Sequence, residues 1–162
     1  MNFNLKLFTV PIKLDNNVEQ TFELFRDEFE ELDNETKKMI GASKEDQIYF
    51  AKNCLIQCFN EQFTVDASMD LYLPADQIFG TSSYLIFKNG TLYKVIFQII
   101  ANDYAAEKYA NEFRKLCHEQ LGNSIEKNEI LEVWEDADSL IVSEWSKENE
   151  NSYFYWEVKT QD

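Results

Sequence analysis

The chain begins with the alternation of apolar and polar residues that is typical of a β-strand. Between residues 3 and 14 the apolar side chains occupy every second position, and the alternation changes phase after Leu7. A strand that keeps its apolar side chains on one face needs a bulge or bend at such a point. Pro11 has no N–H to donate to a neighbour, so we expect this strand at the edge of a sheet.

Two further segments repeat apolar residues at helical spacing. The first predicts a helix over residues 18–32, with apolar residues four and three positions apart: Val18, Phe22, Phe25, Phe29 and Leu32. A short helical piece that ends at Gly41 follows it. The second predicts a helix that starts at Ser43 and continues to about Phe63, with its apolar stripe at Ile48, Ala51, Leu55 and Phe59.

The middle of the chain predicts a hairpin and another helix. Residues 84–100 form two apolar runs joined by Asn89-Gly90, the dipeptide that best tolerates the positive φ angles of a two-residue turn. The second run is apolar on both sides, so we expect a central strand that is covered on both faces. Asp103 then caps a helix that ends before Gly122, with an apolar face made of Ala106, Tyr109, Ala110, Phe113, Leu116 and Cys117.

The last forty residues return to strands. Alternation predicts them over residues 130–135, 139–145 and 152–159, with polar turns between them. The whole order predicts an α+β fold, an antiparallel or mixed sheet of about five to six strands with three to four helices packed on it. No repeat, linker or Pro/Gly-rich boundary divides the chain, so we expect a single acidic domain over residues 1–162.

Composition and charge then exclude several classes of function. Hydrophobic residues make up 44% of the chain, enough for a sizeable core, and 30 acidic against 15 basic residues give a net charge of −15. This charge repels nucleic-acid phosphates and anionic lipid surfaces over a Debye length of about 8 Å. The N-terminus does not resemble a signal peptide, and no apolar run approaches the roughly 20 residues that cross a bilayer. We therefore expect a cytoplasmic protein that contacts neither nucleic acid nor membrane.

Candidate catalytic and metal-binding residues are few. His118 is the only histidine, and no nucleophile motif accompanies it. Cys54, Cys58, Cys117 and His118 lack the spacing of a recognised zinc motif, so we expect the cysteines to be buried, reduced thiols. The four glycines are isolated and build no phosphate-binding loop. We expect no catalytic site, no metal, no cofactor and no enzymatic activity.

Acidic residues and aromatic residues next to them are the stronger signal. Residues 15–35 hold nine acids opposed by one arginine, and residues 126–150 hold nine more. Either group is also what an ordinary solvated surface presents. In the last strand, Tyr153 and Tyr155 share one face and Phe154 and Trp156 the other, so one aromatic set faces outward unless helices or another sheet cover both faces. The candidate partner-binding residues are Glu19, Glu23, Asp27, Glu30, Glu31, Glu132, Trp134, Glu135, Asp136, Asp138 and Trp145.

These features favour a protein-binding module. The leading hypothesis is an inhibitor or immunity-type protein that neutralises a basic partner, such as a toxin or nuclease, with carboxylates in place of phosphates and aromatic anchors that slow dissociation. The alternative is a small-molecule-binding or enzymatic domain with a pocket lined by Phe and Tyr between helices and sheet. A third hypothesis is self-association through an aromatic strand edge, which the charge opposes, so we expect a monomer or weak dimer.

Overall fold

Strand pairing dominates the computed structural model of the chain, which describes residues 3–15, 17, 23, 27–52, 54–63, 80–100, 103–146 and 151–159. The described strands form two antiparallel sheets. The smaller sheet has the order β2-β1-β5-β6, from the strands β1 (Leu5–Leu7), β2 (Val10–Ile12), β5 (Ile56–Cys58) and β6 (Glu61–Phe63). Pro11 lies in β2, at the edge of this sheet, as predicted.

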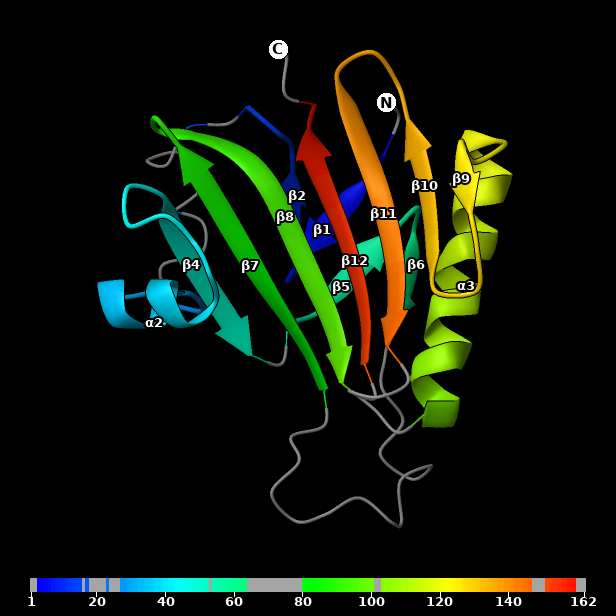
Figure 1. Cartoon of the computed structure of the whole chain (residues 1–162), viewed down its shortest axis with the longest axis horizontal. Coiled ribbons are helices and arrows are strands. Elements are labelled where there is room, and N and C mark those ends of the chain that lie inside the picture. Colours follow the sequence, from blue (N-terminus) through cyan, green and yellow to red (C-terminus); the bar gives the residue numbers. More distant parts are fainter. Residues whose placement is uncertain are drawn as a thin grey trace.

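The larger sheet has eight strands in the order β3-β4-β7-β8-β12-β11-β10-β9. Its strands are β3 (Glu30–Glu31), β4 (Gln47–Lys52), β7 (Gly80–Lys88), β8 (Thr91–Ile100), β9 (Glu126–Lys127), β10 (Leu131–Glu135), β11 (Ser139–Ser146) and β12 (Asn151–Val158). Figure 1 shows the smaller sheet behind this one and α3 (Asp103–Leu121) toward its β10 end. The short helix α2 (Asn34–Met39) lies at the opposite end, beside β4 (Figure 1).

An aromatic cluster joins the larger sheet to the elements behind it. Phe154 of β12 stacks on Phe113 of α3 with 4.1 Å between ring centroids, and it also meets Phe97 of β8 at 5.7 Å and Phe63 of β6 at 5.8 Å. The four rings therefore come from both sheets and the long helix. Phe97, Phe113 and Phe154 are fully buried, which places the centre of the core on this face of the larger sheet.

Several predicted elements are confirmed. The hairpin of β7 and β8 turns at Asn89 and Gly90, whose φ angles of 52° and 82° are those of the expected two-residue turn. The helix α3 begins at Asp103 and ends before Gly122, whose φ is 85°, and it buries the predicted face at Tyr109, Ala110, Phe113 and Cys117. The three predicted C-terminal strands are β10, β11 and β12.

The predicted fold class is wrong, because the described residues contain two helices and a total of twelve strands in sheets of four and eight. The main error lies between residues 43 and 63, where the predicted helix is instead β4, β5 and β6. Cys54, Ile56 and Cys58 are buried while Leu55 is half exposed. The segment that suggested a helical stripe therefore also fits the alternation of a strand. Over so short a segment the helical and the strand pattern cannot be told apart by sequence. The pairing of β4 with β7 and of β5 with β1 selects the strands.

Two tight turns without glycine also escaped prediction. Phe8 and Thr9 join β1 to β2 with φ angles of 55° and 95°, and Phe59 and Asn60 join β5 to β6 with 51° and 71°. Positive φ is uncommon in residues that have a Cβ, so neither dipeptide resembles a hairpin turn in the sequence. The phase change after Leu7 is thus a hairpin turn between two paired strands, where the sequence predicted a bulge or bend within a single strand.

The predicted helix over residues 18–32 is only partly tested. Val18, Phe22 and Phe25 lie outside the described residues. Glu30 and Glu31 form β3, which pairs with β4, so a helix does not extend to Leu32. Phe29, just before β3, is buried and belongs to the core.

The central strand β8 is correct in position but wrong in its predicted burial. It lies between β7 and β12, and Val95, Phe97 and Ile99 are fully buried on the face toward the smaller sheet and α3. Lys94, Ile96 and Gln98 point to the other face and are only half-buried. The face toward the smaller sheet and α3 is therefore the core, whereas the other face is buried only in part among the described residues. On that face Ile48 and Ile86 are buried next to the residues after α2.

The aromatic cluster makes the first testable prediction. We expect Phe154→Ala to lower the free energy of unfolding by about 3–5 kcal/mol, because it removes a buried ring from the contact of three elements. The neighbouring Tyr153→Ala, on the opposite face, is the matched control and should cost much less. Equal losses in urea denaturation of the two variants would contradict the position assigned to the core.

Candidate functional site

The candidate site is the face of the larger sheet that is turned away from α3 and the smaller sheet. Four tyrosines lie on it, and we call it the tyrosine face: Tyr84 of β7, Tyr93 of β8, and Tyr153 and Tyr155 of β12. Each of these side chains is half-buried. They line a hollow of about 750 Å³, which is within the size range of known binding sites.

Strand register arranges the tyrosines in rows across the sheet. Tyr84, Ile96 and Tyr155 lie opposite one another on β7, β8 and β12, and Gln98 and Tyr153 form the next row. Because adjacent residues of a strand point to opposite faces, the same strand supplies Phe154 to the core and Tyr153 and Tyr155 to the tyrosine face. The sequence left open which aromatic set of the last strand faces outward, and the structure places Tyr153 and Tyr155 on the outer face.

Tyr93 reaches this face through a β-bulge. Ile86 pairs with Lys94 and the next residue, Phe87, pairs with Leu92, so Tyr93 is an extra residue on β8. A bulge places two neighbouring side chains on nearly the same side of a sheet, and here these are Tyr93 and Lys94. Nothing in the sequence marks the bulge, so the sequence did not identify Tyr93.

Polar groups surround the rings of the tyrosine face. Lys94 Nζ lies 4.2 Å from the centroid of the Tyr155 ring and 3.3 Å from a carboxylate oxygen of Glu157. At the other end of the hollow, Lys88 Nζ lies 4.3 Å from the centroid of the Tyr93 ring. Tyr155 donates a long, weak hydrogen bond of 3.5 Å to Glu144, and Gln98 donates one of 3.2 Å to Tyr153.

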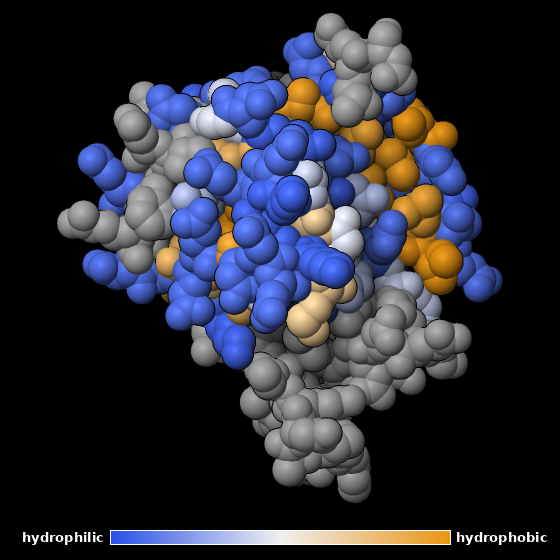
Figure 2. Space-filling model, turned by 60° about the vertical axis from the view of Figure 1, so that its left-hand side comes forward, coloured by the Kyte–Doolittle hydropathy of each residue, from blue (hydrophilic) through white to orange (hydrophobic). Residues whose placement is uncertain are grey.

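The residues after α2 form one wall of the hollow. Ile40, Ala42 and Asp46 line it from the side of β4, while Glu144 of β11 lines it from the far side of β12. In Figure 2 the α2 side has come forward and is covered by hydrophilic residues. Hydrophobic residues gather on the right of Figure 2. The rotation has moved the side that faces the viewer in Figure 1 to this position.

Burial raises the pKa of three of these phenols above the usual value for tyrosine. Burial raises the pKa of Tyr155 to about 12, and the negative charges of Glu144 and Glu157 add to this effect. The pKa of Tyr84 and that of Tyr93 are also raised, mainly by burial. The face therefore offers aromatic rings, phenol O–H donors and carboxylates, and these groups suit a binding surface.

A second polar cluster lies between α3 and β10, within the covered face. Glu132 is only 1% exposed, and one of its carboxylate oxygens lies 2.7 Å from His118 Nε2. Arg114 lies half-buried beside them and bonds to Ser143 of β11. Burial, and next the charge of Glu132, raise the pKa of the Cys117 thiol, which keeps it protonated and unreactive.

Glu132 and Trp134 are therefore corrections to the predicted partner-binding set. Both side chains lie on the α3 side of β10, and Trp134 is 1% exposed with its indole N–H bonded to the carbonyl of Gly122. The sequence places acids on both sides of Trp134, which suggested an exposed strand. The structure buries one of these acids by pairing it with the only histidine.

The remaining predicted residues divide between the two ends of the larger sheet. Glu30 and Glu31 lie exposed on β3, at one edge, and Glu23 and Asp27 are exposed as well, while Glu19 lies outside the described residues. Near the other edge, Glu135 pairs with Lys159 at 3.1 Å, and Asp136 accepts backbone hydrogen bonds from Asp138 and Ser139. Asp138 is exposed and Trp145 is half-buried. The two acidic groups do not converge on one site.

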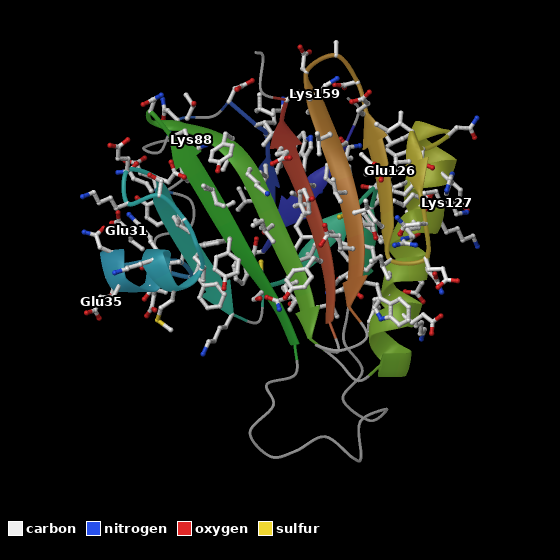
Figure 3. All side chains as sticks on the ribbon, in the orientation of Figure 1. Glu31, Glu35, Lys88, Glu126, Lys127 and Lys159 are labelled. Carbon is white, nitrogen blue, oxygen red and sulfur yellow. The ribbon has the colours of Figure 1, made fainter. Side chains whose placement is uncertain are left out.

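Figure 3 makes the separation visible. Glu31 and Glu35 lie on the α2 side, and Glu126 and Lys127 lie on the β9 side, with the strands of the tyrosine face between them. Lys88 and Lys159 lie near one end of the strands in this view. The acids of the tyrosine face, Asp46, Glu144 and Glu157, were not among the predicted site residues.

Comparisons with known proteins do not name the site: no protein-family model, curated protein or solved structure matches the chain. Among the described residues, no group of three or more His, Cys, Asp or Glu side chains is placed to hold a metal ion. Neither described helix has the length and apolar character needed to cross a bilayer.

The raised pKa of Tyr155 makes a prediction about alkaline pH. A phenol whose pKa is raised by folding stabilises the folded state below its unfolded pKa of about 10, and this contribution is lost as the pH rises toward about 12. Phenylalanine has no ionisable group. We therefore expect the Tyr155→Phe variant to lose less stability than the unmodified chain as the pH rises from about 10 toward about 12. Denaturation midpoints measured between pH 9 and pH 11.5 would reveal the difference, and parallel losses would contradict the assigned environment of Tyr155.

Proposed function

We propose that the protein is a binding module that captures a basic protein through the tyrosine face. The observation that carries this proposal is the set of half-buried tyrosines on the side of the larger sheet that is turned away from α3 and the smaller sheet. Tyrosine is enriched at protein interfaces, because its rigid ring gives much contact area and its hydroxyl bonds to polar groups at little cost in entropy. These tyrosines lie on the central strands of a broad sheet, which suits a macromolecular partner.

The charge of the chain supports a basic partner. A net charge of −15 attracts a positively charged protein over long distances and accelerates association. In this arrangement the exposed acids at both ends of the sheet steer the partner, and the tyrosines make the short-range contacts. A partner that acts on nucleic acid would be inhibited, because carboxylates then occupy the positions that phosphates need. A cytoplasmic location stays a prediction from the sequence.

A small-molecule site is the second candidate, because the hollow of about 750 Å³ is within the range of ligand pockets. The pocket that the sequence predicted, between helices and sheet, is not where this hollow lies. Phe113 and Phe154 stack where α3 meets the sheet, and the hollow is on the opposite side. The two candidates therefore compete for the same tyrosine face.

Capture from a lysate of the source organism tests the proposal with variants. The immobilised chain should retain a basic protein at about 50 mM salt and less of it at about 500 mM, because salt screens the attraction. We expect Tyr84→Ala/Tyr153→Ala to weaken retention by a factor on the order of 30, the usual cost of losing an interface anchor. Leu55→Ala, at an exposed position beside the smaller sheet, is the control that changes neither the tyrosine face nor the net charge.

Two outcomes would overturn the proposal. One is equal retention by the tyrosine variant and the control, which would place the interface elsewhere. The other is that no protein is retained at either salt concentration while a small molecule raises the melting temperature of the unmodified chain and not of the tyrosine variant. That result would establish the second candidate.

A further inference from the structure

We infer that Lys94 occupies the place of an arginine side chain of the partner, so that the Tyr155 ring with Glu157 and Glu144 is a cradle for a guanidinium group. This inference rests on the proposed function and adds the chemistry of the partner. The cradle lies on the central strands of the tyrosine face, where β8, β12 and β11 run side by side. Its occupant is a basic protein segment that presents arginine.

The contacts of Lys94 define the cradle. Its ammonium group is 4.2 Å from the Tyr155 ring centroid and 3.3 Å from Glu157, the residue opposite it on β12. The Tyr155 hydroxyl in turn bonds to Glu144 of β11. One aromatic ring is thus flanked by carboxylates from two strands, and a cation already lies over it.

Guanidinium suits this arrangement better than ammonium. Its planar group stacks on an aromatic ring and bonds to a carboxylate with two parallel N–H groups, whereas the ammonium of lysine acts as a point charge. The cradle offers both partners of guanidinium, a ring surface and a carboxylate, on one side of the sheet. Lys94 therefore occupies the cradle without the planar stacking and paired N–H bonds that a guanidinium would make there.

An incoming guanidinium can displace Lys94. The side chains of Lys94 and Glu157 are 23% and 27% exposed, so water already competes with their contact. The flexible lysine can turn outward when a guanidinium arrives. Lys88 over Tyr93 repeats the pairing of a cation with a ring in the same hollow, which shows that this face accommodates two cations.

The test uses synthetic eight-residue peptides of alternating glycine and arginine, with lysine and citrulline versions as matched probes. Citrulline keeps the shape of arginine without its charge. Calorimetry at about 50 mM salt should show the arginine peptide binding at least about threefold more tightly than the lysine peptide, and no binding of the citrulline peptide. The full chain is used throughout.

Variants then assign the binding to the cradle. Lys94→Met should strengthen binding of the arginine peptide about three- to tenfold, and Glu157→Gln should weaken it by a similar factor. Lys115→Met makes the same change of charge on an exposed position of α3 and should change the affinity less than about twofold. Lys115 is exposed, and Lys94 and Glu157 are partly buried, so denaturation curves are used to confirm that each variant folds.

The inference is overturned if Lys94→Met gains no more than Lys115→Met, or if the arginine and lysine peptides bind equally. Dimerisation of the Lys94→Met chain without peptide, seen by light scattering, would assign the face to a second copy and overturn it as well. None of these results alters the capture experiment with Tyr84→Ala/Tyr153→Ala. The cradle can therefore fail while the proposed function stands, and a failure of the proposed function would appear in the capture experiment instead.

Discussion

The burial of one face of the larger sheet is the constraint on which the rest of the structure depends. Phe154 lies at its centre, in contact with rings from β6, β8 and α3. This cluster fixes both the smaller sheet and the long helix on the same side. An antiparallel sheet is stable with one covered face and one that meets solvent, so this packing also determines where a binding surface can lie.

The period of two residues along β12 separates stability from function. Phe154 and Trp156 belong to the core, while Tyr153 and Tyr155 belong to the tyrosine face. A register shift of one residue would exchange these sets, so pairing with β8 and β11 holds the site in place as firmly as it holds the core.

Sequence patterns predicted the elements whose signals are local and strong. Asn89-Gly90 marks its hairpin because glycine and asparagine tolerate positive φ, and the apolar face of α3 repeats over five turns. The segment from residue 43 to residue 63 failed because its short strands depend on partners that are distant in sequence, and its turn at Phe59 and Asn60 carries no glycine. Strand order and cover by a second sheet are not local properties, so the fold class was missed.

The candidate site was predictable only in part. The alternation of β12 identified an outward aromatic set, but it did not say which set faces solvent. The sequence predicted that Glu132 and Trp134 are exposed, because their contacts with α3 are not visible in it. Glu132 bonds to His118 of α3, and Trp134 bonds to Gly122, just after α3. Tyr93 depends on a bulge, and Tyr84 depends on the pairing of β7 with β8. The acids of the site come from three separate segments.

Hydroxyl-radical footprinting, read by mass spectrometry on the free protein and on its complex with the captured partner, tests whether the tyrosine face is the binding surface. We expect Tyr84, Tyr153 and Tyr155 to be modified in the free protein and protected in the complex. Leu55, which is half exposed beside the smaller sheet, should react equally in both states. Protection of Leu55 with unchanged modification of the three tyrosines would contradict the assignment of the binding surface.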